Sequence, residues 1–150
     1  MYTVKDLAKL LDLTEHTVRF YTDKGLVPNV ARDKNNNRIF DEESINWLRG
    51  AKNLKRCGMS VDDIKKYVEL SLAGDATILE RYEMVRKQKE QVMARLQEAQ
   101  LMAEYITGKE QHYRRIANHQ TEDNMNPASW GSDSSTLNRN CPLLTENAAD

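Results

Sequence analysis

Cysteine and long apolar runs are scarce in this chain of 150 residues. Its two cysteines stand far apart, at positions 57 and 141, and give no disulfide framework, so we expect a protein of a reducing cytosol. No apolar run approaches the ~18 residues that a membrane span requires, so we predict no membrane-spanning helix. Because the N-terminus starts directly with a helical pattern, we also expect no secretory signal.

The chain also lacks the excess of positive charge that is usual in nucleic-acid binders, because its net charge is −1. This charge is unevenly spread. Residues 1–70 hold 13 Lys or Arg against 11 Asp or Glu, whereas residues 121–150 hold 1 against 5. A basic footprint for nucleic acid must therefore be local.

The residue patterns of enzymes and metal centres are missing as well. The sequence has no Gly-rich phosphate loop, no HExxH motif and no Ser/His/Asp grouping. His112 and His119 lie near the C-terminal end without a paired nucleophile, and the lone Cys141 cannot make a tetrahedral metal site. We therefore predict that the protein is not an enzyme and needs no cofactor.

Two short helical patterns with a tight break between them open the sequence. The first starts with Thr3 and Asp6, which have the spacing of a capping box. The second runs from a capping Thr14 to about Lys24, is ended by Gly25, and has few apolar residues. Its early residues thus stay exposed, as in the recognition helix of a helix-turn-helix, which faces base edges in the major groove. A helical hairpin inside an ordinary core is the alternative, and these residues alone do not separate the two.

A short basic hairpin then favours the DNA-binding alternative. Two apolar-basic runs flank the Asn-rich turn 33–37, which is the pattern of a β-hairpin. Its cations suit a wing that lies along phosphates, and they are Arg32, Lys34 and Arg38. A third helix capped by Asp41 and closed at Cys57 follows, and then a fourth starts at Ser60. This order predicts a mainly α protein with a winged helix-turn-helix DNA-binding domain in residues 1–72.

Three motifs occur in order with suitable spacing: TVRFYTDKGLVP, then an arginine separated by five residues from RIF, then LKRCGMSVDDIKKYV. With them the chain resembles the mercury-resistance regulator (MerR) family of bacterial transcription regulators, closely over roughly residues 1–70. The resemblance implies a cytoplasmic, nucleoid-associated homodimer joined by an antiparallel coiled coil. It also implies binding to a pseudo-palindrome in a promoter whose spacer is too long for RNA polymerase. The activated dimer bends and untwists that spacer, so polymerase is affected indirectly.

Departures from the family pattern indicate which type of family member the chain resembles. Metal-responsive members have a cysteine near the start of the long helix, where this chain has the run 76–79 without one. The resemblance is therefore to the type that does not sense metals. Asn37 and Phe40 stand where tyrosines are frequent in the family, and Phe40 lacks the hydroxyl that would contact a phosphate.

The predicted DNA contacts lie in the second helix and in the hairpin. Arg19 can reach a phosphate or a guanine edge, as the matching arginine of the family does, although an ion pair with Glu15 is the alternative. The Tyr21 hydroxyl can reach a phosphate while its ring packs beneath the helix, and Arg38 matches the family's wing arginine. The full set of predicted DNA-binding residues is Thr14, Glu15, His16, Thr17, Arg19, Tyr21, Lys24, Arg32, Lys34 and Arg38.

A long dimerisation helix is predicted in residues 75–107, because Asp75 can cap it and no Gly or Pro follows before Gly108. Its seam alternates at four and three residues, which is typical of a coiled coil: Ile78, Tyr82, Val85, Lys89, Val92, Leu96, Ala99, Ala103 and Ile106. At 1.5 Å per residue the helix would be ~48 Å long. The small head cannot bury such a seam alone, so we expect a partner; a helix folded back on its own domain is the alternative.

The C-terminal part carries weaker patterns. Gly108 is expected to break the long helix, and residues 108–120 to form a short final one. The tail, 121–150, is rich in polar residues and is expected to be largely flexible. Trp130 and the patch 141–144 are apolar exceptions, which either stay in a solvated tail or fold onto the coiled coil or an effector pocket.

Two hypotheses address the effector. Cys57 is a possible sensor thiol for electrophiles or oxidants, because Lys55 and Arg56 beside it favour a thiolate, whereas the helix C-terminus opposes one; a quietly buried cysteine is the alternative. The second hypothesis is a small organic ligand in a pocket shared between subunits, near Tyr67, Tyr82 and Tyr105.

Two other functions remain open from the sequence. The winged helix could belong to a protein-interaction module whose coiled coil recruits partners, or to a DNA-bending architectural protein without inducer control. The long seam argues against the bender, which needs no dimerisation helix.

Overall fold

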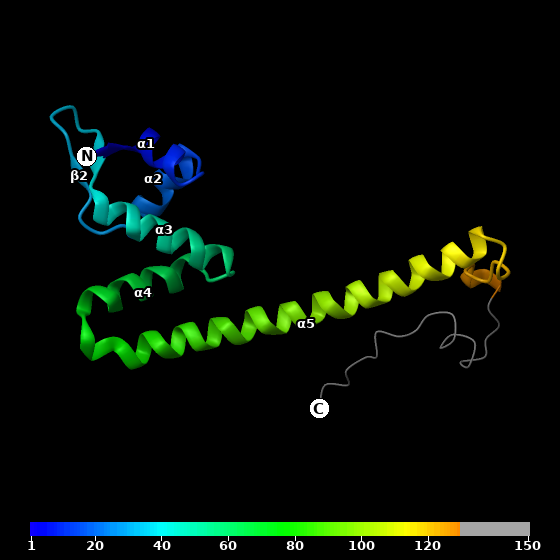
Figure 1. The fold of residues 1–150 in the computed structure, drawn as a ribbon. Helices are drawn as coiled ribbons and strands as arrows, with labels where there is room; N and C mark the ends of the chain where they lie inside the picture. The colour runs from blue at the N-terminus through cyan, green and yellow to red at the C-terminus, as the bar shows by residue number, and fades with distance from the viewer. Residues whose placement is uncertain (130–150) are drawn as a thin grey trace. The chain divides into compact units, whose positions relative to one another are not determined.

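The computed structural model describes residues 1–129. These residues cluster into two compact units that divide between Val92 and Met93, inside the last long helix. The elements, which Figure 1 shows along the chain, are β1 (Tyr2–Thr3), α1 (Val4–Leu10), α2 (Glu15–Asp23), β2 (Ala31–Arg32), β3 (Arg38–Phe40), α3 (Glu42–Arg56), α4 (Val61–Ala73), a 3-10 turn η1 (Asp75–Thr77), α5 (Ile78–Ala117) and a second 3-10 turn η2 (Pro127–Ser129).

Local capping signals define the helix-turn-helix. Thr3 and Asp6 form a complete capping box at the start of α1, in which the Asp6 amide donates to Thr3 Oγ1 at 3.2 Å. Thr14 caps α2 by accepting a hydrogen bond from the Thr17 amide at 3.0 Å. Gly25 then turns the chain with φ +78°, a left-handed conformation that glycine adopts at little cost. The predicted break between two helices is confirmed.

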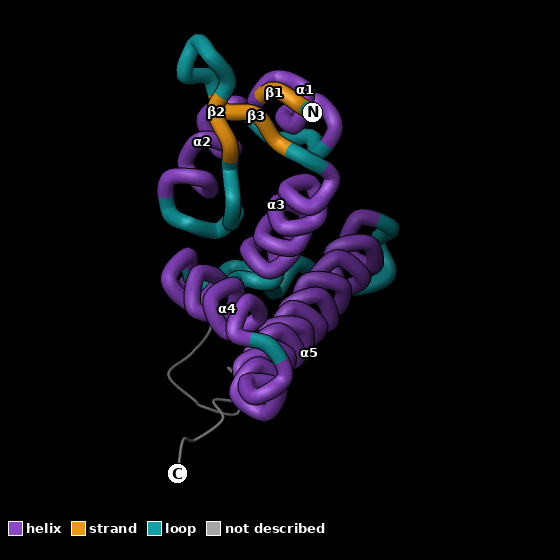
Figure 2. Tube along the Cα trace, turned by 90° about the vertical axis from the view of Figure 1, so that its left-hand side faces the viewer, coloured by secondary structure: helices purple, strands orange, loops and turns teal. Residues whose placement is uncertain are grey.

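The predicted hairpin is present, and it belongs to a larger sheet. β2 and β3 pair antiparallel with Arg32 opposite Arg38, and β1 adds to the other edge of β3 (Figure 2). The Asp33 carboxylate shapes the turn, because it accepts hydrogen bonds from the Asn35 and Asn37 amides, both at 2.8 Å. The sequence did not reveal β1, whose two residues were assigned only to the start of a helix.

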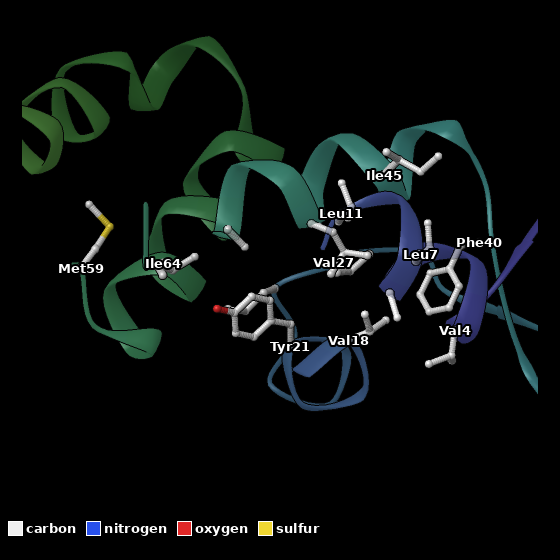
Figure 3. Packing of buried hydrophobic residues seen from close by; sticks show 14 residues of the cluster. Val4, Leu7, Leu11, Val18, Tyr21, Val27, Phe40, Ile45, Met59 and Ile64 are labelled. Carbon is white, nitrogen blue, oxygen red and sulfur yellow. The ribbon is translucent and has the colours of Figure 1, made fainter. Parts of the chain in front are cut away.

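The core of the first unit joins the helix-turn-helix to α3, α4 and the sheet (Figure 3). Asp41 caps α3, and Ser60 caps α4 after the positive-φ Gly58, as the sequence predicted. The largest fully buried side chains come from α1, α2, the loop after α2, β3, α3 and α4, and they are Phe40, Leu7, Leu26, Leu48, Ile64 and Val18. This shared core fixes the position of α2 relative to the wing.

The helix α5 buries none of its residues in the single chain. In its first turns, which belong to the first unit, Ile78 is 52%, Tyr82 59% and Val85 45% exposed. The alternative in which this part of the helix buries its seam against its own domain is therefore wrong. Its start differs from the expected cap at Asp75, because η1 precedes the helix.

The expected end of the long helix needs correction. Gly108 does not break the helix, because α5 continues through it to Ala117, and no separate helix forms in 108–120. A glycine inside a helix costs only about 1 kcal/mol relative to alanine, which a long helix tolerates. At the start of the tail Met125 is buried, and Asn124 Oδ1 lies 2.7 Å from His112 Nε2, while the flexibility expected of most of the tail stays a prediction. Trp130 and the 141–144 patch lie outside the described residues.

Candidate nucleic-acid interface

A groove of about 450 Å³ lies between the N-terminal part of α2, the wing and the start of α1. Of the predicted DNA-binding residues, Glu15, Arg19, Arg32 and Arg38 line it. Lys5 also lines the groove, although a single lysine near a helix start carries no signal in the sequence by itself. The lining therefore holds four cations, Lys5 and the three arginines, against the two carboxylates of Glu15 and Asp33. Lys24 and Lys34, the other predicted cations, do not line this groove, and its role as a footprint for nucleic acid stays a prediction.

Arg19 makes the ion pair that the sequence offered as an alternative to DNA binding. Its Nη2 donates to Glu15 Oε2 at 2.9 Å, and the two side chains are 49% and 44% exposed. An exposed pair of this spacing contributes only about 0.3–0.5 kcal/mol. A bidentate guanine contact contributes about 1–3 kcal/mol, so the pair cannot hold Arg19 away from DNA.

The first turn of α2 separates capping residues from exposed ones. The hydroxyls of Thr14 and Thr17 lie 2.8 Å apart, and Thr14 also accepts from the Thr17 amide. Both threonines therefore serve the cap. His16 and Arg19 are exposed on the same helix.

The wing presents its cations in different ways. Arg32 Nη1 donates to the Asn36 carbonyl oxygen at 2.8 Å, which braces the guanidinium across the turn. Arg38 donates to the Asp23 carboxylate at the end of α2. Lys34 is exposed at the turn. Lys24, after α2, lies over the Phe20 ring with Nζ 5.8 Å from its centroid.

Tyr21 stands apart from this groove. Its side chain is only 6% exposed, and burial raises the pKa of its hydroxyl. Figure 3 shows the hydroxyl pointing towards Ile64 of α4, on the side away from Val18. The expected packing of the ring is confirmed, while the phosphate contact stays a prediction that the position of the hydroxyl does not favour.

Of the residues in the two effector hypotheses, Cys57, Tyr67 and Tyr82 lie in the first unit, away from this groove, whereas Tyr105 lies in the second unit. Cys57 is exposed at the C-terminal end of α3, so the buried alternative is wrong. An apolar cavity of about 280 Å³ lies between α3 and α4. Tyr67 lines it, and neither Tyr82 nor Tyr105 does. The residues around it are Asn46, Trp47, Gly50, Ala51, Leu54, Ile64, Tyr67 and Val68.

Neither a metal site nor a membrane-spanning helix is found in the part of the chain that the structure describes. Within residues 1–129, no three His, Cys, Asp or Glu side chains gather in a way that would hold a metal ion. No helix of the described chain combines the length and apolarity needed to cross a membrane.

A recognition helix beside a basic wing, on a head that leads into a long helix with an exposed apolar seam, defines a winged helix-turn-helix DNA-binding protein. Family models agree with this class: residues 2–70 match the MerR HTH family regulatory protein model, and residues 45–108 match the model described as MerR, DNA binding. An uncharacterized HTH-type transcriptional regulator of Haemophilus influenzae is 34% identical over 114 residues, which are 76% of this chain and 84% of the relative. The chain belongs to the MerR family, as its motifs indicated.

Solved structures lead to the same conclusion. The crystal structure of HiNmlR, a MerR family regulator lacking the sensor domain, bound to promoter DNA, is 33% identical with a TM-score of 0.68. The match covers 78% of this chain and 93% of that one. A MerR family regulator from Bacillus thuringiensis is also 33% identical, with a TM-score of 0.65 and coverage of 75% and 98%. The chain is thus a DNA-binding transcriptional regulator, and its relatives are regulators rather than enzymes.

Proposed function

We propose that this regulator acts as a homodimer on a pseudo-palindromic promoter spacer in the bacterial cytoplasm, and that an effector makes it bend and untwist that spacer. The observation that carries the proposal is the pairing of a basic groove with an unpartnered seam. One groove reads one half-site, and a second copy is needed to read the other. RNA polymerase is then affected through the DNA, because the untwisted spacer realigns the two promoter elements.

The seam of α5 supports the dimer. Apolar seam residues are about half exposed along the helix, with Val92 at 37%, Leu96 at 50% and Ile106 at 60%. A heptad seam of this kind is covered by another helix. Ala99 and Ala103 are small and permit close approach of a partner near the helix end, which suits the antiparallel pairing.

We propose Cys57 as the residue that senses an electrophilic effector. It is exposed at the joint between α3 and α4, and its carbonyl oxygen accepts a hydrogen bond of 2.7 Å from Gln88 Nε2 of α5. An electrophile that forms a covalent bond to the sulfur, with loss of the thiol proton, would crowd this joint. The Gln88 contact supplies a path from the joint to the dimerisation helix.

In vitro transcription tests this sensor, with N-ethylmaleimide as the electrophile. The template is a promoter that carries a DNA sequence bound by the protein. Cys57→Ser should abolish the response, whereas the matched Cys141→Ser variant should keep it. An equal response of Cys57→Ser and the unaltered protein would overturn the role of Cys57. The cavity beside Tyr67 would then be the remaining place for an effector, and Tyr67→Ala would be the variant to examine.

The proposed function itself is tested by selecting bound sequences from a random DNA pool with the full-length protein. An inverted repeat with a fixed central gap is the expected result, because two grooves are held at a set separation. If Arg19, Arg32, Lys34 and Arg38 of both subunits each meet one phosphate, the log–log salt slope of binding should be roughly −7. No enriched sequence at low salt, and little salt dependence, would instead favour a protein-interaction module.

A further inference from the structure

An acidic residue ends the recognition helix at a place where simple electrostatics disfavours it. Asp23 is the last residue of α2, a helix that the structure describes in full. Its last turn has no basic residue. The C-terminal end of a helix carries a partial negative charge, so a carboxylate is destabilised there. DNA phosphates approaching this helix would repel it as well. A local stabilising role does not explain Asp23.

The partner of Asp23 comes from the wing. Arg38 Nη2 donates to Asp23 Oδ1, and this contact joins residues fifteen positions apart. The Arg38 side chain is only 19% exposed, whereas that of Asp23 is 59% exposed. The guanidinium is therefore largely enclosed between the wing and α2, and it lines the DNA groove from that position.

The sheet register gives a second reason for this contact. Arg38 lies directly opposite Arg32 in the β2–β3 pair. Like charges that face each other across strands destabilise the pairing. The Asp23 carboxylate offsets one of these two charges. Since β3 is the central strand of the sheet, its position also sets that of β1 and β2.

We propose that Asp23 is a positioning residue for DNA recognition. Through Arg38 it holds the base of the wing against the end of the recognition helix, and so fixes the separation of Arg19 on α2 from Arg32 on the wing. Arg38 keeps the phosphate contact proposed for it, and the bridge holds its guanidinium in place for that contact. The inference rests on the proposed dimeric reader only for the size of its effect on DNA affinity.

The direction of the change in DNA affinity separates this positioning role from a simple effect of charge. Removing a carboxylate near phosphates should tighten binding, whereas removing the bridge should weaken it. We expect Asp23→Asn to raise the Kd for a duplex enriched by the unaltered protein by about tenfold, because the dimer loses both of its bridges. Asp23→Glu should restore most of the affinity, because it keeps the carboxylate.

A double-mutant cycle identifies Arg38 as the residue through which Asp23 acts. In the Arg38→Ala background, Asp23→Asn should cause no further loss of affinity. The salt slope should stay unchanged in Asp23→Asn, because no phosphate contact is removed. Asp62→Asn, which changes the same charge in the first turn of α4, is the matched control and should leave affinity unaltered.

Hydrogen exchange of the hairpin amides, measured without DNA, tests the role of Asp23 independently of promoter binding. Asp23→Asn should speed exchange at the amides of Asn36 and Asn37, and Asp62→Asn should not. Tighter or unaltered DNA binding by Asp23→Asn would overturn the proposal. Unchanged exchange in the hairpin would overturn it too, even if no duplex were enriched and the dimeric promoter reading itself had failed.

Discussion

Replacement of Leu96 by aspartate examines whether a second copy covers the seam of α5. Leu96 lies on this seam and is 50% exposed in the single chain. The change adds a charge where the proposed partner helix would pack. It removes nothing from the core of the head, because the buried core cluster lies within residues 4–64.

The size of the effect follows from the exposed half of the side chain. Full burial of a leucine side chain stabilises by about 1.5–3 kcal/mol, so covering half of it contributes about 1 kcal/mol. A symmetric dimer has two such side chains, which gives about 2 kcal/mol and a change of ~30-fold in the dimer dissociation constant. Burying an unpaired carboxylate costs more still, so this value is a lower bound.

Sedimentation equilibrium over a range of protein concentrations measures this constant. Ala94→Asp is the matched control, because two residues along an α-helix is a rotation of about 200°, which places the exposed Ala94 on the face away from the seam. Alanine and leucine are both strong helix formers, so the two variants lose similar helix propensity. Circular dichroism at high concentration establishes that both keep their helical content. We expect Leu96→Asp to dissociate at concentrations where Ala94→Asp stays dimeric.

Equal dissociation constants for the two variants and the unaltered protein would refute the seam as the interface. Equal weakening by both variants would refute it as well, because the loss would then reflect added negative charge or lost helix propensity rather than the apolar face. A monomeric Leu96→Asp protein should lose about half of its salt slope on DNA, since one groove makes half of the phosphate contacts.

Three further predictions concern the head. Thr14→Ala should lower the free energy of unfolding by about 1 kcal/mol in urea titrations, because the Thr17 amide loses its cap; an unchanged midpoint would show that the cap is dispensable. Hydrogen bonds from the backbone and then the side chain of Ser44 lower the pKa of Asp41, so its stabilisation is present above the ordinary value of 3.8 and is lost as pH falls below it; urea titrations at pH 3 and 6 should differ less in Asp41→Asn. Arg19→Ala should cost about 1–3 kcal/mol for the enriched duplex and little for a random one in fluorescence anisotropy; equal losses on both would mean a phosphate contact.

Local signals made much of the head predictable. A cap such as Thr14 or Ser60 acts within one helical turn, and the Asn-rich turn specifies a hairpin from adjacent residues, so sequence spacing is enough to locate them. The candidate DNA residues lie on α2, at its two caps and on the wing, and their contacts with DNA stay a prediction. Sequence spacing could not show whether Thr14 and Thr17 cap the helix or contact bases. In the structure their hydroxyls contact each other at the cap.

Contacts between distant residues were not predictable in the same way. β1 has only two residues, too few for a period-2 pattern, and it exists because it pairs with β3. The bridge from Asp23 to Arg38 needs the wing to lie against α2, which only the assembled core brings about. Gly108 was misread because helix propensity is a weak preference, and a helix already formed on both sides of a glycine overrides it.

The groove reconciles a net charge of −1 with DNA binding. Each of its three arginines already has an acceptor on the protein: Glu15 for Arg19, the Asn36 carbonyl for Arg32, and Asp23 for Arg38. The Arg19–Glu15 pair is exposed and weak, so a correctly placed phosphate or base can replace or share it, whereas the bridge from Asp23 to Arg38 is kept. The same carboxylates repel phosphates that arrive in the wrong position. These carboxylates therefore lower the affinity for random DNA more than the affinity for the correct binding site. Selectivity is the difference between the two affinities.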